Sequence, residues 1–449
     1  MEKIRIPRHI DEMISRLEAA GFEAYAVGGG VRDILAGIQP EDWDMCASAE
    51  PSEVMDVFSD RKVIPTGIKH GTVTVIWDEG PVEITTFRAE GRYSDSRHPD
   101  SVEFVKDIKE DLARRDFTVN AMAYAPSKGL VDFFGGRQDL ADSILRCVGE
   151  PAKRFEEDAL RVLRALRFMS QKGFRADEST DAAIRSEFIR LEKIAQERIT
   201  SEFIKLMCGE FAADVIDRYK EVFCFLIPEL EAEVGYDQRS PYHNRTVWDH
   251  TLCAVKNIPA EPAFRVAMLF HDIAKPVVGV LDDNGRGRFV GHPAKGAEMA
   301  DEILRRMKFP NDLREKIVEL IRYHDAKMQS DRVSVRKWLS LLGEELFFQL
   351  MYVRYADSTG KYEKYIGEAE SKNQALIETA EAVLAEGDCF TKDTLAVSGT
   401  DVRDAGFSGK EIGEMLDWLL GEVIEDRLEN DRGILIESLK NKKQSKERE

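Results

Sequence analysis

The sequence lacks the features that mark membrane-spanning and secreted proteins. No apolar run approaches the roughly 20 residues that a helix needs to cross a bilayer, and the N-terminal residues lack the apolar core of a signal peptide. The six cysteines show no CxxC spacing, which predicts reduced, mostly buried thiols instead of a disulfide framework. We therefore expect a cytoplasmic protein with no membrane partner, and the sequence favours no particular oligomeric state.

Positive charge is also in short supply. The 449 residues include 64 Lys and Arg against 83 Asp and Glu, a formal net charge of −19. Such a chain is a poor general binder of polyanions, so contact with nucleic acid needs locally concentrated basic residues. Residues 141–210 hold 13 basic and 13 acidic side chains, so the acidic excess lies elsewhere and this stretch is the expected RNA-facing surface.

The chain is too long for one hydrophobic core, because cores stop growing near about 250–300 residues. Strand-like and helix-like patterns mix over the first 140 residues, and a helical pattern then continues almost to the end. The expected fold class is α+β: a head over residues 1–140, then an all-helical neck (141–240), body (241–360) and tail (361–449). The residues from Ser438 onward carry no apolar pattern, which predicts a frayed end.

A strand, a glycine turn and a helix are predicted in succession near the N-terminus. The strand Ala24–Val27 runs into Gly28, Gly29 and Gly30, and a helix opens at Val31. Backbone N–H groups at such a turn, together with the N-terminus of the helix, can hold a phosphate group.

Two carboxylates follow this turn at a spacing of two. Asp42 and Asp44 lie on one face if their segment is a strand, because side chains alternate along a strand. Paired carboxylates repel each other and need a cation, and hard oxygen ligands favour Mg²⁺. Glu83, between Val82 and Ile84 in a later predicted strand, offers a third carboxylate. Glycine turns and Asp-X-Asp pairs are each common in structural loops, but their combination favours phosphate chemistry.

The segment VGGGVRD followed by DWD resembles the signature of the polymerase-beta-type nucleotidyltransferases. Within them the chain is similar to the class II tRNA nucleotidyltransferases (CCA-adding enzymes) and the related bacterial poly(A) polymerases. The resemblance extends through about residue 240. The other matching segments are Gly67–Val75, Glu83–Arg88, Tyr93–Asp100 (a flexible loop in the family), Asp111–Asn120, Asp132–Gly136, Glu157–Phe168 and Glu197–Glu202.

This resemblance implies a set of site residues. Asp42 and Asp44 resemble the Mg²⁺ ligands that activate the RNA 3′-hydroxyl and bridge the nucleotide triphosphate, with Glu83 beside them as a catalytic carboxylate. The nucleotide-binding residues that it implies are Gly28, Gly29 and Arg32 around the triphosphate, Arg114, Asn120, and the base-reading group Asp158, Arg161, Arg164 and Arg167.

The base-reading group is spaced at steps of three, which predicts one stripe along a helix that begins at Glu157. Asp158 would accept from the exocyclic amine that C and A share, and Arg161 would donate to the ring nitrogen or carbonyl. The alternative is a surface helix in which Glu157 and Arg161 form an ordinary ion pair, worth about 0.3–0.5 kcal/mol.

A second constellation lies in the body. His-Asp adjacency in an apolar helical run places metal-seeking groups in a core that would otherwise reject a charged Asp. The pattern resembles the HD-domain phosphohydrolases, which assigns an HD domain to residues 241–360, and Lys275 would be placed for phosphate. Imidazole ligands favour a transition metal over Mg²⁺, and the alternative is a decayed site with hydrogen-bonded core histidines. The implied metal ligands are His250, His271, Asp272 and Asp357, with His292 and His324 as candidates for a second metal.

The expected function is templateless addition or repair of the tRNA 3′-terminal CCA from CTP and ATP, with a metal-dependent phosphohydrolase in the HD domain. Val397–Gly413 resembles the tail that contacts tRNA in the family. One alternative is an A-adding enzyme or a poly(A) polymerase, although the basic-aromatic stretch typical of the latter is missing after the paired aspartates. Others are an HD-type phosphohydrolase with a vestigial head, and an RNA-binding protein without catalysis.

Overall fold

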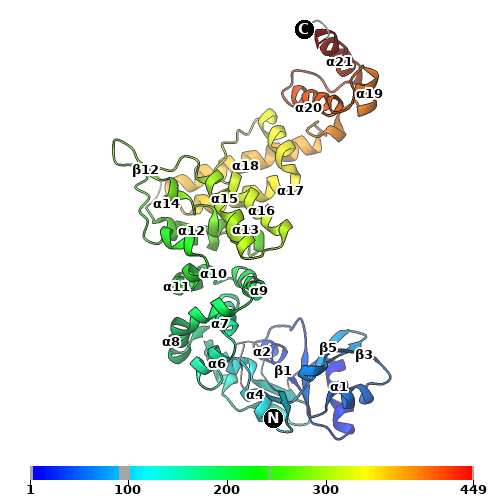
Figure 1. The fold of residues 1–449 in the computed structure, drawn as a ribbon, viewed down its shortest axis with the longest axis vertical. Coiled ribbons are helices and arrows are strands. Elements are labelled where there is room, and N and C mark those ends of the chain that lie inside the picture. Colours follow the sequence, from blue (N-terminus) through cyan, green and yellow to red (C-terminus); the bar gives the residue numbers. More distant parts are fainter. Residues whose placement is uncertain (1–3, 91–101, 242–243, 447–449) are drawn as a thin grey trace. The chain divides into compact units, whose positions relative to one another are not determined.

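The computed structural model describes residues 4–90, 102–241 and 244–446 (Figure 1). It divides into two compact units, Met1–Pro228 and Glu229–Glu449, here called the N-terminal and C-terminal units. Within the described residues, no helix is both long enough and apolar enough to span a membrane. The loop expected at Tyr93–Asp100 lies outside the described residues.

A seven-stranded mixed sheet organises the first part of the N-terminal unit, which confirms the α+β prediction. Its strands lie in the order β3, β4, β5, β2, β1, β8, β9. β2 and β5 run parallel, and the other neighbouring pairs are antiparallel. The strands are β1 (Ala24–Val27), β2 (Asp44–Ala47), β3 (Lys62–Gly67), β4 (Thr72–Trp77), β5 (Gly80–Thr86), β8 (Met122–Ala125) and β9 (Gly129–Asp132); β6 (Arg88–Glu90) and β7 (Val102–Phe104) form a separate pair.

Helices pack on this sheet through apolar stripes. In α1 (Arg8–Ala19) four apolar residues repeat with helical spacing, Ile10, Met13, Ile14 and Leu17, and all are buried. Full burial of such a side chain contributes about 1.5–3 kcal/mol to the stability of the fold. The packing of α1 therefore stabilises the sheet that carries the residues at its edge. The other helices of this part are α2 (Gly29–Leu35), α3 (Pro51–Val57), α4 (Ile108–Ala113) and α5 (Gly136–Ala141).

The rest of the N-terminal unit is mainly helical, as predicted. α7 packs against α9, and Leu163, Leu166 and Phe203 are fully buried. A two-stranded pair, β10 (Ile144–Leu145) and β11 (Arg175–Ala176), interrupts the helical pattern. The helices are α6 (Pro151–Glu157), α7 (Leu160–Lys172), α8 (Glu178–Glu187), α9 (Gln196–Met207), α10 (Ala212–Arg218) and α11 (Lys220–Leu226).

The C-terminal unit is built from helices and one short hairpin, in which β12 (Val280–Leu281) pairs with β13 (Gly287–Arg288). α12, α13, α16 and α17 pack against one another. α17 bends at Gly343, whose φ of 74° is not helical. The helices are α12 (Val247–Lys256), α13 (Pro262–Phe270), α14 (Lys275–Val278), α15 (His292–Arg306), α16 (Asn311–Tyr323), α17 (Arg332–Thr359), α18 (Glu363–Ala385), α19 (Gly399–Asp404), α20 (Glu411–Ile424) and α21 (Arg432–Lys446).

The end of the chain differs from the prediction. α21 continues through Lys446, and its Leu435 and Leu439 are fully buried in a small core with Leu419 of α20. Leu435 and Leu439 lie one helical turn apart, so they face the same side. The prediction of a frayed end from Ser438 is therefore wrong within the described residues, because two leucines suffice to hold the helix against α20.

Candidate active site and candidate metal centre

The glycine turn joins β1 to α2 as the sequence predicts. Gly28 has a φ of 70°, in the left-handed region that glycine adopts without strain. A Cβ on Gly30 would come within 2.9 Å of the Trp43 ring, so only glycine lets this indole pack behind the turn. Trp43 is buried, whereas Asp42 and Asp44 on either side of it are exposed. The expected alternation is therefore present, and both carboxylates face away from the core.

The third expected carboxylate lies beside this pair. Asp44 is the register partner of Glu83 where β2 and β5 run parallel, and Glu83 is exposed between the buried Val82 and Ile84. Partial removal of water raises the pKa of Asp44 above its ordinary value, and the charges of Asp42 and Glu83 raise it further. Mutual repulsion of this kind is relieved by a bound cation.

Two neighbouring arginines of the second motif bind one buried carboxylate. Asp111 is fully buried and binds both of them: Nη2 of Arg114 lies 2.7 Å from its Oδ1, and Nη2 of Arg115 lies 3.4 Å from its Oδ2. Arg115 lies against the glycine turn, since a Cβ on Gly28 would be 3.2 Å from its Nη1, and its charge partly offsets the rise in the pKa of Asp44. Sequence reasoning named Arg114 and missed Arg115 and Asp111, because an Arg-Arg pair does not show which side chain points to the turn.

Arg32 and Asn120, both expected at the nucleotide, are in contact. Nη1 of Arg32 donates to Oδ1 of Asn120 at 2.7 Å, and its Nε and Nη2 donate to Asp33. Asn120 in turn donates to Asp116, which also accepts two bonds from Arg164. Burial alone would raise the pKa of Asp116, but Arg164 and Asn120 outweigh it and hold that pKa at about 2. Asp116 therefore links two predicted parts of the site, a role the sequence analysis missed.

The predicted helix from Glu157 is interrupted, which corrects the expected geometry of Asp158. α6 ends at Glu157, Asp158 has extended dihedral angles (φ −140°, ψ 102°), and α7 begins at Leu160. The side chain of Asp158 accepts from the Leu160 backbone N–H at 3.1 Å, a bond that favours a helix start at this point. It also accepts from Arg198 at 3.1 Å. Asp158 thus does not share a helical stripe with the arginines that follow it.

Those arginines hold carboxylates of the same unit. Nη1 of Arg161 lies 2.7 Å from Glu157, the ion pair of the alternative interpretation, and the pair is shielded because Arg161 is buried. Arg167 donates to Glu202 at 2.6 Å. A carboxylate has about four lone-pair sites, so its two bonds leave Asp158 further accepting capacity.

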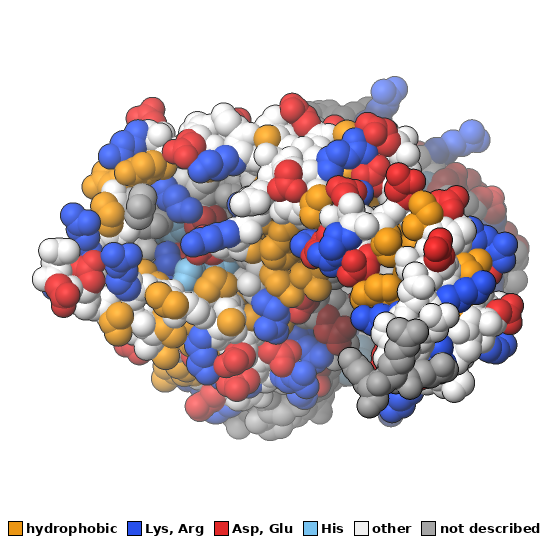
Figure 2. Space-filling view, turned by 90° about the horizontal axis from the view of Figure 1, so that it is seen from above, with side chains coloured by type: hydrophobic (Ala, Val, Ile, Leu, Met, Phe, Trp, Pro, Cys, Tyr) orange, Lys and Arg blue, Asp and Glu red, His pale blue; other side chains and the backbone are white. Residues whose placement is uncertain are grey.

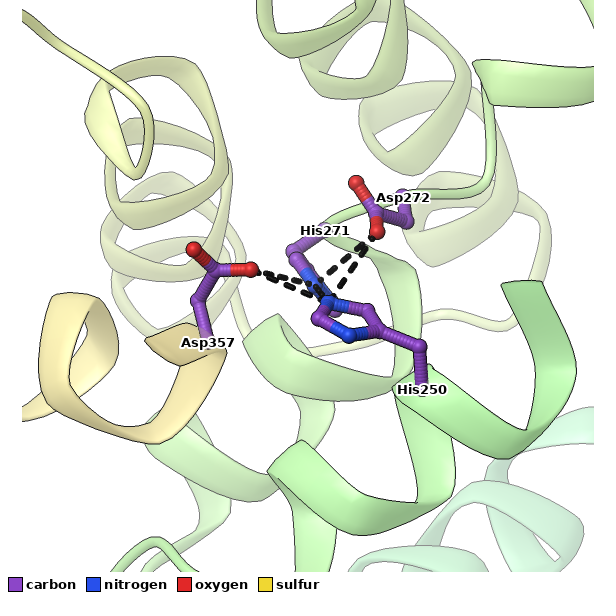
Figure 3. Close-up of side chains that lie close together, drawn as sticks. All are labelled: His250, His271, Asp272 and Asp357. Atoms are coloured by element: carbon purple, nitrogen blue, oxygen red, sulfur yellow. Dashed lines mark hydrogen bonds and ion pairs between the residues drawn. The ribbon is translucent and has the colours of Figure 1, made fainter. Parts of the chain in front are cut away.

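The HD pattern forms a compact cluster in the C-terminal unit. His250 comes from α12, His271 and Asp272 lie between α13 and α14, and Asp357 lies in α17; all four are buried and point toward one another (Figure 3). One ligand atom from each lies within 4.8 Å of the others. Nε2 of His250 is 3.0 Å from Asp357 and 3.4 Å from Asp272, and Nε2 of His271 is 3.3 Å from Asp272.

A second group shares Asp272. Its Oδ1 lies 3.4 Å from Nε2 of His292 and 3.8 Å from Nε2 of His324, so the structure brings together all six predicted HD residues. Nδ1 of His292 and Nδ1 of His324 bond to the backbone carbonyls of Phe289 and Ile321 at 2.8 and 2.7 Å. In the neutral rings, both Nε2 atoms therefore turn lone pairs toward each other across 3.2 Å.

Two facing lone pairs need a proton or a metal ion between them. Burial and the neighbouring charge of His271 lower the pKa of His324 to about 3, so His324 is neutral, the form that binds metals. The carbonyl bonds to Nδ1 are also the usual support for a ligating Nε2. The donor set therefore fits a metal ion, as the sequence predicts.

Two further residues shape this cluster and were missed. Glu233 is fully buried, accepts from Thr251 at 3.1 Å, and has a pKa raised to about 8 by burial and by Asp272. A Cβ on Gly360 would overlap Nδ1 of His250, so this position admits only glycine. Lys275, expected at a phosphate, is buried with Nζ 2.6 Å from Asp272 and 2.9 Å from Gln238.

The two sites differ in how far they are assembled. Among the described residues, the only groups of three or more potential ligands within 4.8 Å of one another belong to the HD cluster. Asp42, Asp44 and Glu83 do not form such a group. Mg²⁺ in phosphate-transfer sites takes one or two carboxylates and completes its shell with water and substrate phosphates, which suits an open carboxylate set.

Comparison with protein families places known domains on three stretches of the chain. Residues 24–146 match the "Poly A polymerase head domain", residues 173–233 the "Probable RNA and SrmB- binding site of polymerase A", and residues 245–360 the "HD domain".

Curated relatives match part of the chain. A CCA-adding enzyme of Pediococcus pentosaceus is 39% identical over 279 residues, 60% of this chain and 70% of that protein. One of Lactobacillus helveticus is 51% identical over 197 residues, 44% of this chain and 49% of that protein. The chain thus spans about half the length of the latter relative.

Solved structures extend the likeness over the whole chain. The Bacillus stearothermophilus CCA-adding enzyme in complex with CTP matches with a TM-score of 0.71 and 27% identity, covering 97% of both chains. The Thermotoga maritima CCA-adding enzyme complexed with tRNA_CCA matches with a TM-score of 0.57 and 20% identity, over 97% of this chain and 96% of that one. The second similarity concerns the fold alone.

Proposed function

This chain belongs to the family of CCA-adding enzymes, and from that premise we propose that it adds or repairs the 3′-terminal CCA of tRNA from CTP and ATP without a nucleic-acid template. The observation that carries the proposal is the exposed pair Asp42 and Asp44, with Glu83 in register beside them. The relative from Bacillus stearothermophilus was solved with CTP and the one from Thermotoga maritima with tRNA_CCA.

In the proposed reaction the RNA 3′-oxygen attacks the α-phosphate of the nucleotide. The new P–O bond forms as the bond to pyrophosphate breaks, and the hydroxyl proton passes to solvent water. Asp42 and Asp44 are the proposed Mg²⁺ ligands, with Glu83 as the third carboxylate; the metal would polarise the phosphate and lower the pKa of the hydroxyl. Arg115, held by Asp111 against the glycine turn, adds positive charge beside Gly28.

The remaining nucleotide-binding residues keep their proposed roles, now with supports. Arg32 is held by Asn120, Arg164 by Asp116 and Arg167 by Glu202, so their side chains are fixed before a nucleotide arrives. Pre-ordered donors lose little freedom on binding. The proposed nucleotide-binding residues are Gly28, Gly29, Arg32, Arg114, Asn120, Asp158, Arg161, Arg164 and Arg167. The proposed domain boundaries lie at residues 140, 240 and 360, and the tail after residue 360 is proposed to contact tRNA.

The test is direct. Purified full-length protein is incubated with tRNA lacking CCA and with each nucleoside triphosphate in turn, and the product ends are sequenced. Addition of C, C and A in order, with no incorporation from UTP or GTP, supports the proposal. Runs of A alone would identify the A-adding alternative, and no addition at all would leave the head without its proposed activity.

A second activity is favoured by the six-residue HD cluster. We propose that His250, His271, Asp272 and Asp357, extended by His292 and His324, hold a transition metal and hydrolyse small phosphate esters, adding water across a P–O bond. Such esters include 2′,3′-cyclic phosphates at damaged RNA ends, whose opening and removal would free the hydroxyl that the head extends. A screen of nitrophenyl phosphates and cyclic nucleotides with Mn²⁺, Co²⁺, Ni²⁺ or Fe²⁺ tests this activity.

A further inference from the structure

A cavity of about 980 Å³ opens directly beside the HD cluster. Asp272, His292, His324 and Asp357 all line it, so a molecule in the cavity reaches the proposed metal ligands. Figure 2 shows a hollow on one face with a histidine side chain (pale blue) inside it and Lys and Arg side chains (blue) around it. The volume is far larger than a single phosphate group needs and lies at the upper end of ligand pockets, about 300–1,000 Å³.

Three basic side chains of this cavity are not exposed: Lys275, Arg354 and Lys361. Two of them are already used by the cluster, because Lys275 and Lys361 each place Nζ 2.6 Å from a carboxylate oxygen of Asp272 or Asp357. Those two cations offset the charge of the ligand carboxylates.

Arg354 is different, because it bonds only to neutral groups. Its Nε donates to Oδ1 of Asn373 at 3.2 Å and its Nη1 to the carbonyl of Ala326 at 2.6 Å. Within the described part of the chain no carboxylate oxygen lies within 4.0 Å of it. Asp325 and Asp357 act on its charge only from farther away.

The guanidinium is nevertheless held rigidly. Asn373 is buried and donates its own amide to the Met351 carbonyl at 3.0 Å, so the acceptor that orients Arg354 is itself fixed. Arg354 precedes Asp357 by three residues in α17, which places the two on the same helix face. A guanidinium cannot lose its proton in a protein, and a half-buried cation without a counter-ion is costly.

These observations point to an anionic ligand as the missing counter-ion. We propose that Arg354 binds the phosphate group of the ester that the HD cluster hydrolyses, a role that rests on the phosphohydrolase activity proposed above. The fork of N–H donors suits a phosphate oxygen pair, and the position one turn from Asp357 brings that phosphate to the metal ligands. Arg354 thereby selects phosphoesters over neutral esters of the same size.

The experiment compares full-length wild-type protein with Arg354→Gln, Arg354→Lys and a matched control, Arg322→Gln. Arg322 lies on α16 outside the residues that line the cavity, is partly exposed, and pairs with Glu319. Binding of inorganic phosphate is measured by calorimetry, metal content by elemental analysis, and hydrolysis of p-nitrophenyl phosphate by kcat and KM. Nucleotide addition to tRNA and the thermal melting curve report on folding.

For Arg354→Gln we expect phosphate affinity and kcat/KM to fall about 10- to 100-fold, as for loss of a charge-assisted hydrogen bond, with metal content and nucleotide addition unchanged. Arg354→Lys should recover part of the affinity, and Arg322→Gln should behave as wild type. Wild-type affinity and KM in Arg354→Gln would overturn the assignment of Arg354 alone. A wild-type protein that takes up no metal and hydrolyses nothing would instead remove the phosphohydrolase, and this assignment with it.

Discussion

The candidate site of the head and the HD cluster place their carboxylates in opposite surroundings. In the head, Asp42, Asp44 and Glu83 are exposed and do not form a closed ligand group. In the HD cluster, by contrast, the ligands are buried and lie within 4.8 Å of one another. An open set can leave room for substrate phosphates in the metal shell, whereas a closed imidazole-carboxylate set defines most of the shell before any substrate arrives.

The largest expected effect concerns the open set. Asp44→Ala or Asp42→Ala should lower nucleotide addition by at least about a thousandfold, because each removes a proposed metal ligand, and such a ligand is worth several kcal/mol in the transition state. Single-turnover incorporation of CTP into tRNA lacking CCA measures the loss. Asp78→Ala is the matched control, since Asp78 is exposed and only pairs with Arg61 at the surface. Near-normal incorporation by either aspartate variant would contradict the assignment.

Substitutions in the HD cluster should separate phosphoester hydrolysis from CCA addition. The double variant His271→Ala with Asp272→Ala removes a shared part of both ligand groups, so bound metal and phosphoester hydrolysis should fall to background. CCA addition should stay within about twofold of wild type, since the two sites belong to different compact units and sites that share no partners act independently. Elemental analysis and both assays on the same preparation decide the matter, and hydrolysis that persists in the double variant would exclude this cluster as its source.

Metal removal should affect stability in one unit only. A metal at about 100 times its Kd contributes roughly 2.7 kcal/mol to the folded state, which corresponds to about 5–10 °C in Tm for a unit of this size. Calorimetry with and without a chelator should therefore show a lower Tm for the HD-containing transition. The double variant should show no chelator effect, and an equal shift in that variant would place the metal elsewhere.

The smallest effect concerns base choice in the head. Asp158→Ala should weaken discrimination of CTP over UTP, and of ATP over GTP, by about 10- to 100-fold, since a base-edge contact is worth about 1–3 kcal/mol. Binding of the triphosphate should change less, because Asp158 lies away from the glycine turn in sequence and accepts from Arg198. Ratios of kcat/KM for the four nucleotides measure the effect, and unchanged ratios would leave Asp158 with a structural role.

Local rules predicted the parts of both sites that depend on local geometry. The run of glycines predicted the turn, in which Gly28 has a positive φ. The alternation of side chains predicted that Asp42 and Asp44 are exposed on either side of the buried Trp43. Residue type predicted that the His271–Asp272 pair needs partners, because a charged Asp inside an apolar run is costly, whereas the family resemblance supplied the rest of the HD cluster. These predictions share a dependence on residue type and local backbone conformation alone.

The missed features depend on contacts of particular side chains. The helix break at Asp158 follows from its bonds to Leu160 and Arg198, and no glycine or proline marks it in the sequence. The choice between Arg114 and Arg115 at the turn depends on the buried Asp111 between them. These contacts fix the directions of individual side chains, which a periodicity cannot show.

The strand order of the head has a consequence for biosynthesis. β1 lies between β2 and β8, yet β8 (Met122–Ala125) is translated almost a hundred residues after β1 (Ala24–Val27). At about 5–20 residues per second, a ribosome needs roughly 5–20 s between these two strands. Throughout that interval one edge of β1 has no strand partner on the nascent chain, and the Arg32–Asn120 bond that braces the glycine turn cannot form. The paired aspartates are thus synthesised well before the framework that orients them, so the face that carries them matures late, when the ribosome is already building the neck.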